Sequence, residues 1–126
     1  MCGEVVEVGS DVTLVKVGDY VAAESHLTCG HCFQCRTGQA HVCKNYRILG
    51  VDRDGSFAEY VVLPETVLWK TLLAIPPELA CVQEPLGNAV DAALVEDLTG
   101  QTVLITGCGP TGLFAAAGRD EQPAPP

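Results

Sequence analysis

Four cysteines between positions 29 and 43 are the clearest chemical feature of the sequence. Cys29, Cys32, Cys35 and Cys43 are spaced C-x2-C-x2-C-x7-C. Thiolates bind zinc tetrahedrally, and gaps of two residues let neighbouring cysteines turn toward one ion. A disulfide framework, free buried cysteines and an iron–sulfur cluster are the alternatives, although iron–sulfur runs end C-x3-C-P and Lys44 follows Cys43 here. The spacing favours a closed structural zinc site without room for a substrate.

A glycine pattern near the C-terminus is the second chemical feature. Residues 107–112 read G-x-G-x-x-G, between a strand-like segment at 101–106 and an alanine-rich segment at 113–117. In this context Gly107 would make the tight turn, Gly109 would let a pyrophosphate approach the backbone, and Gly112 would let the helix pack closely. The pattern predicts a dinucleotide-binding turn, and a glycine turn without a ligand is the alternative.

The elements that must position these motifs are short. Strands are predicted at Glu4–Val8, Tyr20–Ala23 and Phe57–Leu63, because β-branched residues there alternate with polar ones between glycine turns. This rhythm indicates a small barrel or sandwich, with Trp69 and residues 72–75 in its core. Further along the chain, helices are predicted at 78–82 and 89–98.

The composition of the chain limits the kinds of function that we expect of it. The chain has 126 residues, 48% of them hydrophobic, and a formal net charge of −9. An acidic surface disfavours binding to nucleic acid and to anionic membranes. No apolar run reaches the ~20 residues that span a bilayer. The remaining cysteines, beside a thiolate metal site, suggest a reducing compartment, so we expect a cytoplasmic protein.

Zinc lobe, small β-domain and dinucleotide turn, in this order, resemble the zinc-dependent medium-chain dehydrogenase/reductase family. The resemblance extends over residues 3–117, most clearly at 24–28, 41–45, 50–60 and 83–90. It implies a mixed α/β and β fold. Residues 1–80 would form a partial GroES-like β-barrel catalytic domain with its zinc lobe at 26–46, and residues 81–117 would begin a Rossmann NAD-binding domain.

The resemblance also implies an activity. The stretches quoted are most like members that use NAD to oxidise the 3-hydroxyl of threonine to 2-amino-3-oxobutanoate, with a zinc ion as Lewis acid. Glu84 then matches a glutamate beside the catalytic zinc, and His26 a histidine that bears on substrate choice. The four cysteines match the structural zinc ligands, and Gly107, Gly109 and Gly112 match the pyrophosphate turn. Another zinc-dependent alcohol or polyol dehydrogenase, and a non-catalytic zinc-stapled binding module, remain alternatives.

The departures from the family pattern concern its catalytic zinc. Its upstream cysteine and Gly-His-Glu motif have no counterpart here, and Cys2 does not match the cysteine. We therefore expect a fragment of an enzyme that is inactive alone. Its parent would act on a small amino alcohol and, as in the family, form a homo-oligomer, a tetramer. The polar tail at 118–126 departs from the family pattern, as a frameshift or a truncated gene would leave it.

Overall fold

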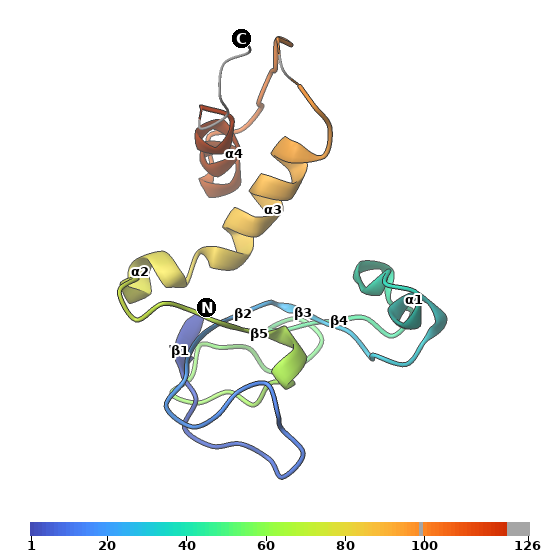
Figure 1. The fold of residues 1–126 in the computed structure, drawn as a ribbon, viewed down its shortest axis with the longest axis vertical. Coiled ribbons are helices and arrows are strands. Elements are labelled where there is room, and N and C mark those ends of the chain that lie inside the picture. Colours follow the sequence, from blue (N-terminus) through green and yellow to red (C-terminus); the bar gives the residue numbers. More distant parts are fainter. Residues whose placement is uncertain (99, 121–126) are drawn as a thin grey trace. The chain divides into compact units, whose positions relative to one another are not determined.

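The computed structural model describes residues 1–98 and 100–120, with side chains at 1–98 and 100–118. The chain divides into two compact units, Met1–Cys81 and Val82–Pro126, and each is described by itself (Figure 1). Most of the predicted polar tail at 118–126 lies outside the described residues; residues 118–120 belong to the last helix.

Two small antiparallel sheets form the first unit. One has the strand order β1-β2-β5, and the other pairs β3 with β4. The strands are β1 (Cys2–Glu4), β2 (Tyr20–Ala23), β3 (His26–Leu27), β4 (Arg47–Ile48) and β5 (Leu68–Lys70). Short helices lie between and after them: α1 (Phe33–Arg36), the 3-10 turns Ala40–Val42 and Glu65–Val67, and α2 (Pro77–Ala80). The predicted strand at Tyr20–Ala23 is confirmed as β2, the central strand of the larger sheet.

A valine cluster forms the core beneath this sheet. Val5, Val15 and Val21 are buried together. The loop between β1 and β2 is held in place by Glu65, whose Oε2 accepts hydrogen bonds from the backbone N–H groups of Thr13 and Leu14, at 2.7 and 2.6 Å. The Glu65 carboxylate therefore accepts hydrogen bonds from two backbone N–H groups that have no strand partner.

An ion pair links β5 of this sheet to the residue that precedes β2. Lys70 Nζ, on β5, lies 2.9 Å from Asp19 Oδ2, immediately before β2. The hydrogen bond from Lys70 holds the pKa of the Asp19 carboxyl below its usual value. The pair therefore favours the ionised carboxylate at neutral pH.

Several predictions about the first unit are wrong. The two sheets are open, so no closed barrel forms among the described residues. Of the predicted strand Glu4–Val8 only Glu4 belongs to a strand, and Phe57–Leu63 forms none. Alternation specifies a strand only when a neighbour supplies hydrogen bonds, and no described segment pairs with 57–63. Most of the predicted core positions are also exposed, Trp69 by 64% and Leu73 by 86%, whereas Ile75 is half-buried.

Two helices dominate the second unit. α3 (Gln83–Leu94) contacts α4 (Pro110–Asp120). The helix predicted at 89–98 begins earlier, at Gln83, because Pro85 falls in the first turn, where a missing N–H costs no intrahelical hydrogen bond. The strand predicted at 101–106 is wrong, since those residues have no regular structure. Among residues 82–98 and 100–120 the second unit therefore has no strand of a Rossmann βα unit.

No helix among the described residues is long and apolar enough to span a membrane.

Candidate metal centre

The four predicted cysteines converge in the first unit. Their Sγ atoms all lie within 4.8 Å of one another. The Cys32–Cys35, Cys32–Cys43 and Cys29–Cys43 sulfur separations are 3.5, 3.8 and 3.6 Å. A tetrahedron with zinc–sulfur bonds of about 2.3 Å has edges of about 3.8 Å, whereas a disulfide would bring two sulfurs to about 2.05 Å. All four are free thiols, and their arrangement fits a structural zinc ion.

Short local elements bring the four sulfurs close together. Cys32 precedes α1 and Cys35 lies within it, while Cys43 ends the 3-10 turn at 40–42. The chain reverses at Gly30 and Gly38, whose φ angles are +73° and +80°. Side chains with a Cβ rarely adopt such angles, so these two glycines permit the turns that bring the cysteines together.

Backbone and side-chain N–H groups point at the sulfurs. Cys43 Sγ accepts hydrogen bonds from the N–H groups of Cys29 and Asn45, at 3.4 and 3.3 Å. Asn45 Nδ2 also donates to Cys29 Sγ, at 3.5 Å. Donors of this kind stabilise thiolate charge, which a site with four anionic ligands and one dication requires.

The thiols differ in their affinity for protons. The hydrogen bond from Asn45, followed by that from the His31 backbone, lowers the pKa of Cys29 to about 5. Backbone hydrogen bonds from Cys35 and Lys44 also lower the pKa of Cys32. Burial, followed by the adjacent Cys32 sulfur, raises the pKa of Cys35 to about 12. Without metal the cluster thus holds thiolate at Cys29 and a proton at Cys35, and a zinc ion must displace that proton.

His26, predicted from the family resemblance, lies at the base of the same lobe. It belongs to β3, and its Nδ1 is 2.6 Å from Glu24 Oε1. Its ring stacks on Tyr46, with ring centroids 5.1 Å apart. The sequence prediction included His26 and missed both neighbours.

The other predicted site residues are not members of the cysteine cluster. Glu84 is in the first turn of α3, in the second unit, where its Oε1 accepts a hydrogen bond from Asn88 Nδ2 at 3.0 Å. Cys2 lies in β1, and Tyr20 donates its hydroxyl to the Cys2 sulfur at 3.6 Å, which raises the pKa of Tyr20 to about 12. No group of three or more metal-binding side chains among the described residues includes Cys2.

The glycine turn has part of the predicted local geometry. Gly107 has a φ of +100°, and α4 begins at Pro110. A Cβ at Gly112 would lie 2.2 Å from the Gly107 carbonyl oxygen, so this position requires glycine. Gly107 thus makes a turn, and Gly112 lets α4 approach a neighbouring backbone closely. That backbone is the turn at Gly107 and not a strand.

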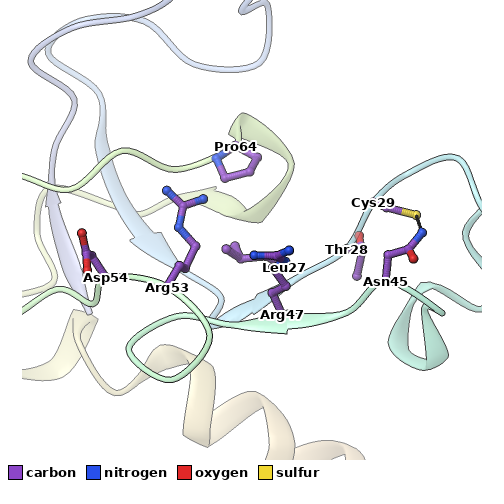
Figure 2. Close-up of a pocket in the computed structure, with 8 residues that line it drawn as sticks. All are labelled: Leu27, Thr28, Cys29, Asn45, Arg47, Arg53, Asp54 and Pro64. Carbon is purple, nitrogen blue, oxygen red and sulfur yellow. Dashed lines mark hydrogen bonds between the residues drawn. The ribbon is translucent and has the colours of Figure 1, made fainter.

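A pocket of about 550 Å³ beside the zinc lobe was not predicted. Figure 2 shows its lining, with Leu27 from β3 and Arg47 from β4, and with Asn45 linked to Cys29 by a hydrogen bond. The Arg53 guanidinium donates to the Val62 carbonyl at 3.2 Å. The remaining lining residues are Thr28, Asp54 and Pro64. Sequence reasoning missed the pocket because its walls come from four separate segments, at 27–29, 45–47, 53–54 and Pro64.

The fold and the cysteine cluster agree with the family comparison. Residues 1–76 match the model of the alcohol dehydrogenase GroES-like domain. This match covers more than half of the chain, so the chain belongs to that family. Within it, the four cysteines fit a structural zinc site, as predicted.

The chain is also similar to individual proteins of known name. The chain is 56% identical, over 117 residues, to an L-threonine 3-dehydrogenase of Pyrococcus horikoshii, which covers 93% of this chain and 34% of that protein. It therefore spans about a third of the length of the curated relatives it matches.

The solved structures that the chain resembles include dehydrogenases as well. One is a short chain alcohol dehydrogenase from E. coli CFT073 complexed with NADH, with a TM-score of 0.81 and 36% identity over 90% of this chain and 34% of that one. Another is galactitol-1-phosphate dehydrogenase from Escherichia coli, with a TM-score of 0.78 and 32% identity over 90% and 33% of the two chains.

Proposed function

We propose that this chain supplies the structural zinc lobe and the cofactor turn of an NAD-dependent L-threonine 3-dehydrogenase. In this proposal residues 1–80 are part of the GroES-like catalytic domain, and residues 81–117 begin the NAD-binding domain. The observation that carries it is the 56% identity to an L-threonine 3-dehydrogenase over 117 residues. The reaction converts the 3-hydroxyl of threonine to a ketone and transfers a hydride to NAD.

The four cysteines have a structural role in this proposal. A closed set of four sulfurs leaves no coordination position for a substrate, so the zinc would hold the lobe and take no part in the reaction. Support comes from the sulfur separations of 3.5 to 3.8 Å and from the N–H groups directed at Cys29 and Cys43.

The glycine turn would hold the cofactor pyrophosphate. Positive φ at Gly107 and the close approach at Gly112 support this role, as does the NADH in the structure of the similar E. coli dehydrogenase. Gly109 precedes α4 and would let a phosphate reach the N-terminal N–H groups of that helix.

Glu84 and His26 would serve the substrate. A catalytic zinc, when bound, supplies Lewis acidity that makes the hydroxyl easier to deprotonate. Glu84 is the residue of this chain that would stand beside it. Cys2 does not fit as a ligand, because its sulfur is engaged by Tyr20 in the β1-β2-β5 sheet.

An alcohol or polyol specificity is the second candidate function. The 32% identity to galactitol-1-phosphate dehydrogenase favours it, since the cysteine lobe and the glycine turn suit either substrate. The two candidates differ in the substrate that the assembled enzyme oxidises fastest.

A chimeric enzyme tests the proposal. The matching 117 residues would replace their counterpart in the Pyrococcus horikoshii enzyme, and NADH production would be followed with L-threonine and with galactitol 1-phosphate. We expect kcat/KM for threonine within about tenfold of the parent, a loss of at most about 1.4 kcal/mol. A Glu84→Ala chimera should lose most of this activity.

Folding of each chimera is checked by its zinc content and thermal transition. A folded, zinc-loaded chimera that oxidises the polyol phosphate faster than threonine would contradict the proposal. The isolated chain serves as the control and should produce no NADH from threonine.

A further inference from the structure

Two cysteines outside the zinc lobe meet where β1 contacts α2. Cys2 lies in β1, and Cys81 directly follows α2. The two elements contact each other within the first unit (Figure 1), although 75 positions separate Cys2 from Pro77. Both cysteines are free thiols, and Cys81 is exposed while Cys2 is partly buried. Neither is a member of the cysteine cluster, so the zinc site does not account for them.

Hydrogen bonds to one turn of α2 bring the two thiols near each other. Cys2 Sγ donates to the Pro77 carbonyl oxygen at 3.4 Å, and the backbone N–H of Cys81 donates to the same oxygen at 2.9 Å. Cys81 Sγ donates to the carbonyl oxygen of the next residue, Glu78, at 3.4 Å. Consecutive carbonyl oxygens of a helix are close together, because the rise is only about 1.5 Å per residue. The two sulfurs therefore bind neighbouring acceptors on one short helix.

The backbones of the two segments are also in contact. The nitrogen of Met1, adjacent to Cys2, donates to the Cys81 carbonyl oxygen at 3.1 Å. A disulfide forms where the Cα atoms of two cysteines are about 4.4–6.8 Å apart and both side chains turn toward each other. α2 has only four residues, and so short a helix resists a small displacement weakly. Rotation of the two side chains with a small shift of α2 would therefore join the sulfurs.

Tyr20 lies beside the same two sulfurs. Its hydroxyl donates to Cys2 Sγ at 3.6 Å. The hydrogen bond with Cys2, followed by burial and by the charges of Cys2 and Cys81, raises the pKa of Tyr20 to about 12. Both sulfurs thus act on one hydroxyl, which agrees with the proximity that the carbonyl contacts indicate.

We propose that Cys2 and Cys81 are an oxidative modification site, at which hydrogen peroxide converts the two thiols to a disulfide that joins β1 to α2. The exposed Cys81 sulfur reacts first: an S–O bond forms, the O–O bond breaks, and a sulfenic acid and one water result. The Cys2 sulfur then attacks the Cys81 sulfur, the S–O bond breaks, and a second water leaves. The thiols lose two electrons and two protons in total, and the peroxide takes up both.

This site is separate from the proposed function and does not depend on it. In a reducing compartment such a disulfide is transient, because cellular thiols reduce it again. The modification would therefore be reversible, and dithiothreitol would return both cysteines to free thiols.

Peptide mapping tests the proposal in the full chain. The zinc-loaded chain would be treated with a small excess of hydrogen peroxide, and its remaining thiols would be alkylated. Cleavage after glutamate separates Cys2, Cys81 and Cys108 into residues 1–4, 79–96 and 97–121. We expect residues 1–4 linked to residues 79–96, and the link lost after dithiothreitol. A Cys2 that stays alkylated, or one that is linked to Cys108, would overturn the proposal.

Variants separate a specific pair from general thiol reactivity. Cys81→Ser should leave Cys2 without a disulfide at the same peroxide dose. Cys108→Ser, the matched control, also changes an exposed cysteine and should leave the link between Cys2 and Cys81 unchanged. Loss of the link in Cys108→Ser, or a disulfide at Cys2 in Cys81→Ser, would overturn the proposal. If Cys81→Ser fails to retain zinc, the peptide map of the wild-type chain decides.

The disulfide should also stabilise the first unit. It would close a long loop that contains the zinc lobe, and closing such a loop restricts the unfolded chain. The thermal midpoint of the first unit should be higher after peroxide treatment by roughly 5 °C or more, and dithiothreitol should reverse the shift. Equal midpoints for the linked and the reduced chain would overturn the proposal, because a bond that fits the folded unit must stabilise it.

Discussion

The cysteine lobe and the glycine turn are both predicted from short motifs, and the two regions differ in how completely their predicted geometry forms. In the lobe all four sulfurs meet within 4.8 Å. At the turn, Gly107 and Gly112 have the expected local conformation, but residues 101–106 form no strand. The lobe includes every group that its geometry requires, within residues 29–45. The turn also requires a neighbouring strand.

The difference shows which motifs can be interpreted alone. A metal site closes by local reversals, here at Gly30 and Gly38, and its donors are adjacent in sequence. A strand gains stability from a partner elsewhere in the chain. An alternating pattern therefore shows only that a segment can form a strand, and another segment must pair with it for the strand to form. The comparison predicts that the lobe depends on metal and that the second unit does not.

Removing the metal should produce the largest effect. Structural zinc contributes about 10–16 kcal/mol of apparent binding free energy, which in such a lobe is folding free energy. Excess chelator should therefore abolish hydrogen-exchange protection at residues 26–48 and leave α3 and α4 unchanged. Exchange measured by mass spectrometry with and without chelator checks this. Protection that persists in the lobe would show that packing, rather than metal, holds it.

Zinc affinity should rise with pH. The raised pKa of Cys35, about 12, means that this thiol is protonated in the metal-free chain at pH 7–9, so zinc must displace a proton. Cys29, with a pKa of about 5, is already a thiolate and adds no dependence. Each displaced proton gives about a tenfold gain in affinity per pH unit, about 1.4 kcal/mol. Competition with a chromophoric chelator measures the slope, and a slope below one would contradict the assignment.

Gly112→Ala should destabilise the second unit while leaving zinc binding unchanged. The new Cβ would lie 2.2 Å from the Gly107 carbonyl oxygen, and such overpacking costs about 1–3 kcal/mol, more than the gain of about 1 kcal/mol from alanine in a helix. Gly118→Ala is the matched control, because its Cβ meets nothing within 4 Å. Helical circular dichroism should fall for Gly112→Ala and not for Gly118→Ala. Equal spectra would show that the turn does not hold α4.

Asn45→Ala should have the smallest effect. It removes the side-chain hydrogen bond that chiefly lowers the pKa of Cys29, so that pKa should rise in the metal-free chain. The loss of one N–H···S bond costs about 1 kcal/mol, so zinc should still bind. Thiolate absorbance against pH checks the shift. An unchanged titration would assign the low pKa to the backbone N–H groups alone.

The family and the cysteine cluster could be predicted from the sequence because both depend on residues adjacent along the chain. The positioning of His26 could not. Glu24 is close in sequence, but Tyr46 is brought to the ring by the pairing of β3 with β4. Nothing in the local pattern of either segment specifies that pairing.

The errors in the fold have one physical origin. Phe57–Leu63 alternates as a strand should, yet no described segment pairs with it, and Phe57 is fully exposed. Trp69 was assigned to a core, but it lies in β5 with 64% of its surface exposed. A pattern shows which face could be buried. Burial itself depends on what packs against that face.

Zinc stoichiometry by native mass spectrometry tests the central claim most directly. The purified, reduced chain should bind one zinc ion, as should Cys108→Ser, which changes an exposed cysteine outside the cluster. Cys32→Ser should bind none. A reduced wild-type chain without zinc, or a Cys32→Ser variant that retains it at full occupancy, would contradict the assignment of the four cysteines as a structural zinc site.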